Sequence, residues 1–120
     1  MAAEGVRLDT AIREAAGIPV VEVGGEVDIY TAPEFESAIN QAVDAGAKHL
    51  IIDLTNVSHM DSSGFGNLLS VAKRLRPKGG SVNLVGCRDG IERMLRITRL
   101  DTIFGMHPTV DEAVEALGKE

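Results

Sequence analysis

The segment Leu50-Ile51-Ile52-Asp53-Leu54 is the strongest indication of the fold of this chain, because it is almost continuously apolar. Such a run is typical of a strand that is covered on both faces or lies in the centre of its sheet. We therefore predict a central strand over His49 to Leu54. A helix over 64–76 and a β-branched strand from Ser81 to Val85 should follow it. Together these elements predict a βαβ unit with parallel strands and a right-handed crossover.

Further strands are expected outside this unit. The segment from Ile18 to Val23, continuing to Ile29, is rich in β-branched residues, and Ile103-Phe104 is a weaker candidate. The segment from Val6 to Ala15 has apolar residues without a clean period, and we predict an edge strand there.

The remaining helices are marked by apolar residues at helical spacing. Two of them open with a capping box, in which a threonine and a glutamate three residues later satisfy each other's backbone donors. These motifs are Thr31-Ala32-Pro33-Glu34, whose helix should stop at Gly46, and Thr109-Val110-Asp111-Glu112. A shorter stripe predicts another helix from Ile91 to Thr98.

The composition fits one globular domain of the α/β class. The chain has 120 residues, 44% of them hydrophobic, and 12 basic against 18 acidic residues give a net charge of −6. We expect a single domain over residues 1–120, with its core at about 6–117. It should be a mixed sheet of four or five strands, with about four helices packed mainly on one side. The acidic balance argues against direct binding to nucleic acid or to an anionic membrane, because both need clustered positive charge.

Cysteine usage and hydropathy favour the cytoplasm. The single cysteine, Cys87, excludes an intrachain disulfide and a multi-cysteine zinc site, which suits a reducing compartment. The longest charge-free run, Ser62 to Ala72, is far shorter than the roughly 20 apolar residues of a membrane span, and the N-terminus lacks a secretory signal. The histidines show no metal-ligand spacing, so we expect neither a metal nor a cofactor.

The connection that follows the central strand carries a surplus of capping residues. Asp61, Ser62 and Ser63 each make a good N-cap, whereas a helix needs only one. Gly64 and Gly66 then lie in the first helical turn, where each costs up to about 1 kcal/mol relative to alanine. Small residues here either leave the backbone and a serine hydroxyl open to a closely approaching group, or form a turn that packs tightly on the sheet. The sequence leaves both interpretations open.

A second connection, Gly24 to Thr31, should reach the same edge of the sheet, since strand carboxyl ends and helix N-termini converge there in open α/β sheets. Thr31 would cap its own helix. We therefore expect the charge of Asp28 to be free for recognition.

Three motifs in these connections resemble those of a known family. They are Gly25-Glu26-Val27-Asp28, Thr31-Ala32 and Met60-Asp61-Ser62-Ser63-Gly64-Phe65-Gly66. Together they resemble the STAS-domain proteins that act as bacterial anti-sigma factor antagonists, and the resemblance extends from about Val6 to Leu117. Phe65 departs from the pattern, because the family more often has an aliphatic residue there.

The resemblance implies a phosphorylation-controlled binding module rather than an enzyme. It implies that Ser62 is phosphorylated by a partner that is both an anti-sigma factor and a serine kinase, and that Asp28 lies beside this serine. The unphosphorylated protein would bind that partner and so release the sigma factor, and a serine phosphatase would restore this state. The partner-binding residues expected on this basis are Asp28, Thr31, Asp61, Ser62, Ser63 and Gly64.

Other functions have weaker support in the sequence. The alternative within the same family is a sensor or scaffold subunit that binds a small ligand or a nucleotide. A serine hydrolase would frame its nucleophile as Gly-x-Ser-x-Gly, which neither Ser62 nor Ser63 matches, and His59 precedes Ser62 by only three residues. Gly64 and Gly66 lack the third glycine of a dinucleotide-binding loop.

Overall fold

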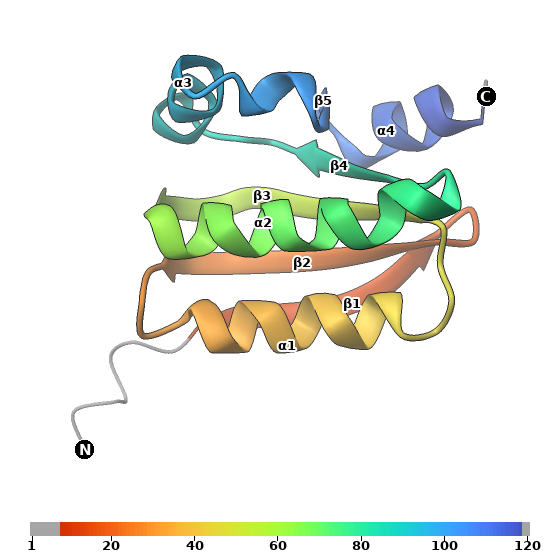
Figure 1. Cartoon of the computed structure of the whole chain (residues 1–120), viewed down its shortest axis with the longest axis horizontal. Coiled ribbons are helices and arrows are strands. Elements are labelled where there is room, and N and C mark those ends of the chain that lie inside the picture. The colour runs from red at the N-terminus through yellow and green to blue at the C-terminus, as the bar shows by residue number, and fades with distance from the viewer. Residues whose placement is uncertain (1–7, 119–120) are drawn as a thin grey trace.

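The fold is described from a computed structural model, for residues 8–118. Within these residues a five-stranded sheet has the order β1-β2-β3-β4-β5 (Figure 1). Its strands are β1 (Asp9–Ala15), β2 (Ile18–Val27), β3 (His49–Met60), β4 (Ser81–Val85) and β5 (Gly105–His107). Strands β2 to β5 are parallel to one another, and β1 pairs antiparallel with β2. The predicted mixed sheet is therefore confirmed.

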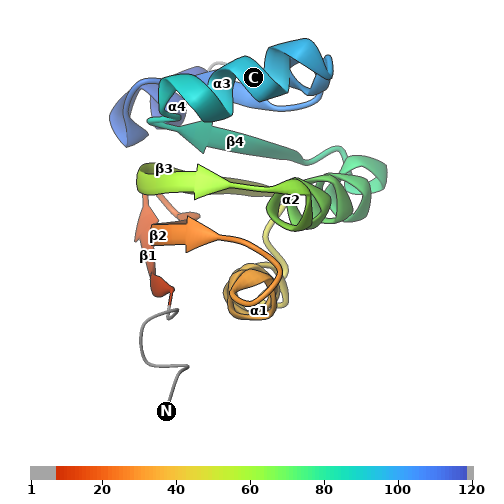
Figure 2. The ribbon, with the colours of Figure 1, turned by 90° about the vertical axis from the view of Figure 1, so that its left-hand side faces the viewer.

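Helices cover the two faces of the sheet unequally. They are α1 (Ala32–Val43), α2 (Ser62–Leu75), α3 (Asp89–Ile97) and α4 (Val110–Leu117). Buried side chains of α1, α2 and α3 pack with Leu50, Ile52 and Leu54 of β3 in the larger core cluster. Ile51 points the other way, into a smaller cluster with α4. The expectation of helices mainly on one side is confirmed, and Figure 2 shows α4 on the face opposite α1 and α2.

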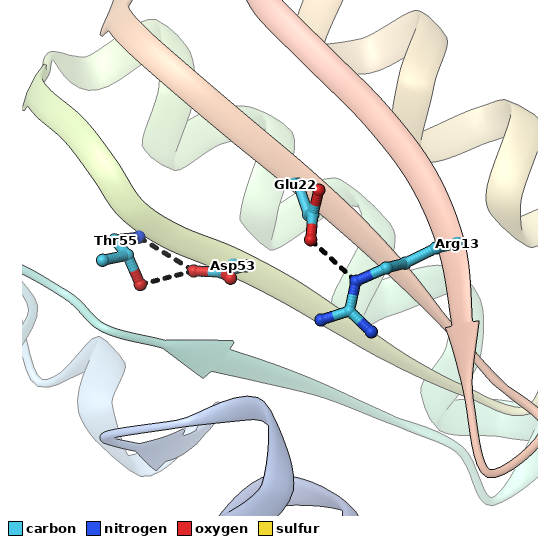
Figure 3. A network of polar contacts seen from close by, with 4 residues as sticks. All are labelled: Arg13, Glu22, Asp53 and Thr55. Carbon is cyan, nitrogen blue, oxygen red and sulfur yellow. Dashed lines mark hydrogen bonds and ion pairs between the residues drawn. The ribbon is translucent and has the colours of Figure 1, made fainter.

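The face of the sheet that α4 leaves open is polar. Arg13 of β1 forms an ion pair with Glu22 of β2, with 2.7 Å between Nε and Oε2 (Figure 3). Asp53 lies opposite Glu22 on β3, and its Oδ1 accepts hydrogen bonds from the backbone N–H and the hydroxyl of Thr55 at 3.0 and 2.6 Å. The charged groups of this face thus have polar partners within it, as expected of a sheet face in contact with water.

The central strand was predicted correctly in place and neighbours, but its length was wrong. β3 lies between β2 and β4 and is parallel to both, as expected. The strand was predicted to end at Leu54, but it continues to Met60. Only Asp61 therefore separates β3 from α2. Beyond Leu54 the buried residues are Val57 and Met60, spaced by three because the β2–β3 register shifts twice. A strand irregularity of this kind conceals the two-residue period that marks a strand in the sequence.

Smaller differences occur at the other strand ends. β1 is the predicted edge strand, although Val6 lies outside the described residues. β2 ends at Val27, so that Ile29 belongs to a turn. The strand predicted at Ile103-Phe104 is wrong: β5 begins at Gly105, and Phe104 is buried in the larger core cluster instead. Among the described residues, no helix has the length and apolar character needed to cross a membrane.

The two predicted capping boxes have different outcomes. The hydroxyl of Thr109 accepts a hydrogen bond from the backbone N–H of Glu112, as expected for the cap of α4. The hydroxyl of Thr31 makes no such bond at the start of α1. The prediction of a side-chain cap from Thr31 is therefore wrong, and the reason lies in the turn that precedes this helix.

Candidate functional site

The two connections singled out in the sequence meet at one edge of the sheet. Val27 and Met60 are paired at the ends of the parallel strands β2 and β3, and the N–H of Asp61 donates to the carbonyl of Val27 at 3.0 Å. Asp28 and Asp61 are the residues that directly follow these neighbouring strands. Viewed from this edge, α1 and α2 lie side by side and nearly end-on (Figure 2). The N-termini of both helices therefore adjoin the two carboxylates.

Asp61 alone caps α2. Its backbone is extended, and its Oδ1 accepts a hydrogen bond from the N–H of Ser63 at 2.8 Å. Ser62 is the first residue of the helix and is exposed, whereas Ser63 is half-buried. Within residues 8–118, neither serine hydroxyl has a hydrogen-bond partner. The surplus of caps seen in the sequence thus leaves two hydroxyls that the helix does not need.

The two glycines of α2 differ in their surroundings. Gly64 is buried, and a Cβ there would clash with the side chain of Met60 and come within 2.8 Å of Cγ1 of Val27. A Cβ on Gly66 would meet no atom within 4 Å. Tight packing of the helix on the strand ends therefore accounts for Gly64, but not for Gly66.

Asp28 and Thr31 form the turn between β2 and α1. Oδ1 of Asp28 accepts hydrogen bonds from the N–H groups of Tyr30 and Thr31 at 2.9 and 3.0 Å. The Thr31 hydroxyl accepts from the N–H of Asp28 at 3.0 Å and donates to the carbonyl of Glu26 at 2.7 Å. The aspartate is thus a turn-forming residue of the Asx type. The sequence had led us to expect a free carboxylate at Asp28. In the structure, this carboxylate accepts hydrogen bonds within the turn instead.

The expected partner-binding residues therefore divide into two groups. Thr31 is only 2% exposed and Gly64 is also buried, so neither offers a side chain to a partner. These two residues shape the edge from beneath its surface, and their place among the partner-binding residues stays a prediction. Asp28, Asp61 and Ser63 are partly exposed, and Ser62 is exposed.

Sequence reasoning missed three residues at this edge. The side-chain amide of Asn67 in α2 donates to the carbonyl of Ala32 at 3.0 Å and so joins the two helix N-termini. Ile29 and Tyr30 are 68% and 75% exposed, in the turn that Asp28 forms. The signal available was the placement of large apolar residues between a turn-forming aspartate and a helix start, where small polar residues are usual.

Cys87 lies at a different place on the molecule. It lines a pocket of about 450 Å³ beyond the end of β4, together with Glu92, Met106 and His107. Burial, and next the negative charge of Glu92, raises the pKa of the Cys87 thiol from 9.0 to about 11. The thiol is therefore protonated at neutral pH, as expected for a small apolar residue. In the part of the chain that is described, no group of three or more His, Cys, Asp or Glu residues could hold a metal ion.

Comparison with known proteins agrees with the geometry. The model of the STAS domain matches residues 9–113. The chain is 37% identical over 95 residues to the anti-sigma-B factor antagonist of Staphylococcus aureus, covering 79% of this chain and 84% of that protein. A similar antagonist from Staphylococcus epidermidis is 36% identical over the same share of both chains.

Solved structures give the same result. An anti-sigma factor antagonist from Mycobacterium paratuberculosis superposes with a TM-score of 0.83 at 33% identity, covering 91% of this chain and 92% of that one. The antagonist SpoIIAA in its unphosphorylated form shares the fold, with a TM-score of 0.78 at 22% identity over 93% of this chain and 98% of its own. The chain therefore belongs to the STAS-domain family, in which its relatives are anti-sigma factor antagonists.

Proposed function

We propose that this protein is an anti-sigma factor antagonist switched by phosphorylation of Ser62. In its unphosphorylated form it binds an anti-sigma factor that is also a serine kinase, and the sigma factor is released. Phosphorylation ends the binding, and a serine phosphatase restores it, all in the cytoplasm. The protein itself acts by binding and not by catalysis. Supporting this proposal are the names of the 37% and 36% identical relatives and the geometry of the α2 N-terminus.

The observation that carries the proposal is the position of Ser62. It is the first residue of α2 and is exposed, and Asp61 has already supplied the helix cap. The backbone N–H groups and the positive dipole end of a helix stabilise a nearby phosphate. A phosphate on Ser62 would therefore be tolerated by the fold, because the hydroxyl is not needed for it.

A phosphate would change the binding surface much more than the fold. It adds about −1.5 to −2 charges at pH 7, beside Asp61 and at the same edge as Asp28, which directly follows the paired residue Val27. A partner site shaped for a small neutral hydroxyl would then meet added bulk and a group that is expensive to desolvate. A few kcal/mol of such destabilisation corresponds to a hundredfold or more in affinity.

The other residues of the edge have distinct roles in this proposal. Asp28, Asp61 and Ser63 contact the partner around Ser62, because each is partly exposed at the same edge. Thr31 fixes the turn that holds Asp28, and Gly64 lets α2 approach the strand ends.

The test uses serine variants with purified anti-sigma factors that contain a kinase domain, taken from the same genome. Ser62→Ala should bind the cognate anti-sigma factor with wild-type affinity and incorporate no radiolabelled phosphate from ATP. Ser62→Asp should bind at least about tenfold more weakly, although one carboxylate imitates a phosphate only in part.

Ser63→Ala is the matched control, since this neighbouring hydroxyl also has no role in the cap. It should keep full phosphate incorporation at Ser62. Incorporation into Ser62→Ala at the wild-type level, or its loss only in Ser63→Ala, would show that the switch is not Ser62.

A further inference from the structure

Two large apolar side chains lie in solvent next to the proposed phosphorylation site. Ile29 is 68% exposed and Tyr30 is 75% exposed. Tyr30 is the only tyrosine of a chain without tryptophan. The three phenylalanines are all buried: Phe35, Phe65 and Phe104. An aromatic-poor chain thus places its one amphipathic aromatic residue at the surface.

The fold does not need these two side chains. The turn around them is held by backbone groups and by the side chains of Asp28 and Thr31: the N–H of Tyr30 donates to Oδ1 of Asp28, and the N–H of Ala32 donates to the Asp28 carbonyl at 2.8 Å. Small polar residues would form such a turn equally well. Among the exposed large apolar side chains of the described residues, Ile29 and Tyr30 are the two most exposed, and they are adjacent in the chain. They therefore form a small apolar patch of the kind that partners cover.

Further hydrogen bonds fix the position of the turn that carries the pair. The turn is joined to the start of α2 on one side by the bond from Asp61 N–H to the Val27 carbonyl, and on the other by the bond from Asn67 to Ala32. A rigid aromatic side chain on a rigid turn loses little conformational entropy when a partner covers it. The backbone that carries Ile29 and Tyr30 is thus fixed relative to the start of α2, where Ser62 lies.

We propose that Ile29 and Tyr30 are the apolar anchor of the interface with the anti-sigma factor, and that they insert into an apolar pocket with a cationic rim. This inference rests on the proposed function. Tyrosine is among the residues that dominate binding energy at protein interfaces. Three acidic residues near the pair are exposed or partly exposed: Glu26, Asp28 and Glu34. Their negative charge is complementary to positive charge around the pocket of the partner.

The first experiment uses the single tyrosine as a reporter. Protein labelled with 3-fluorotyrosine has one ¹⁹F resonance, from Tyr30. On titration with the purified cognate anti-sigma factor this resonance should shift and broaden as the complex forms, with the affinity that calorimetry measures. With Ser62-phosphorylated protein it should stay at its free position over the same concentrations.

The second experiment measures affinity with matched variants. Ile29→Ser and Tyr30→Ser should each weaken binding by about 30-fold or more, and Tyr30→Phe should weaken it less. Ile97→Ser is the control, because Ile97 is a similarly exposed isoleucine, at 66%, on α3. It should bind within about twofold of wild type. Thermal unfolding of all four variants should match wild type, since none of these side chains is buried.

The outcomes separate this inference from the proposed function. The anchor would be overturned if the wild-type protein binds while its ¹⁹F resonance does not move, or if Ile29→Ser and Tyr30→Ser both bind with full affinity. Either result would leave the Ser62 switch standing. An equal loss in Ile97→Ser would also overturn it, because any exposed apolar side chain would then have the same effect. A ¹⁹F shift that depends on protein concentration without a partner would assign the pair to self-association. If no kinase-containing anti-sigma factor binds the wild-type protein, both proposals fail.

Discussion

Asp28 and Asp61 are two residues of the same type that perform the same local task at neighbouring strand ends. Each carboxylate accepts hydrogen bonds from backbone N–H groups where a helix begins. The sequence predicted such a role for Asp61, as one of three candidate caps. It did not predict it for Asp28, because the sequence offered a capping box in which Glu34 would accept the hydrogen bond from the N–H of Thr31 that Asp28 accepts in the structure. The hydroxyl of Thr31 instead bonds backward, to Glu26, and no sequence rule decides between two local partners of similar strength.

The role of Asp28 in the turn predicts a difference between two substitutions. Asp28→Asn keeps an oxygen acceptor for Tyr30 and Thr31, so the free energy of unfolding should change by less than about 0.5 kcal/mol. Asp28→Ala removes the acceptor and should destabilise the protein by about 1 kcal/mol, as losses of helix caps do. Urea unfolding of both variants measures this. Equal stability of the two would mean that the hydrogen bonds from the carboxylate do not support the turn.

The two glycines at the start of α2 predict opposite effects of the same change. Gly64→Ala would push a methyl group against Met60 and Val27, and we expect it to lower the free energy of unfolding by about 1–3 kcal/mol. Gly66→Ala meets open space and should raise it by up to about 1 kcal/mol, because alanine favours the helix. Thermal denaturation of the pair gives the comparison. If Gly64→Ala were as stable as Gly66→Ala, close packing would not explain the buried glycine.

Elements were predictable where their pattern is regular and local. The strand from Ser81 to Val85 was predicted with the bounds that β4 has, because a short segment with two valines and a leucine is bounded by glycines on both sides. The second half of β3 was missed, since its buried positions Val57 and Met60 follow a spacing of three set by the register shifts against β2. Those shifts arise from pairing with a distant part of the chain. A sequence window around β3 does not contain them.

The central position of β3 predicts a large effect from one buried charge. Ile52 is fully buried between paired neighbours on both sides. Ile52→Asp would place a carboxylate in the core without a partner, a change that costs several kcal/mol, and should unfold the domain. His59→Asp, at an exposed position of the same strand, is the control and should remain folded. Circular dichroism distinguishes the two, and a cooperative melt of Ile52→Asp at the wild-type temperature would contradict the core assignment.

At the scale of the molecule, the helices cover the faces of the sheet, and the edge at the ends of β2 and β3 remains accessible to a partner. α1, α2 and α3 build the main core on one face, and α4 covers part of the other. The edge at the ends of β2 and β3 carries two helix N-termini, with the carboxylates of Asp28 and Asp61 at its surface. Convergence of these connections followed from the α/β topology and was predictable. The exposed pair Ile29 and Tyr30 was not, because a sequence does not state which apolar residues remain outside the core.

Charge on the whole molecule also bears on how phosphorylation of Ser62 would weaken binding. One candidate cause is long-range repulsion between the partner and this chain, whose net charge of −6 the phosphate makes more negative. Salt screens such repulsion over about 10 Å at 0.1 M and about 3 Å at 1 M. The other is the local bulk and desolvation of the phosphate, which salt does not remove. Because Ser62 is an exposed residue within the proposed contact surface, we expect the local cause to dominate. The ratio of Kd values for the phosphorylated and unphosphorylated protein, measured by calorimetry, should then change by less than about threefold between about 0.05 and 1 M salt. A ratio that falls to near one at high salt would instead assign the switch to repulsion across the whole surface.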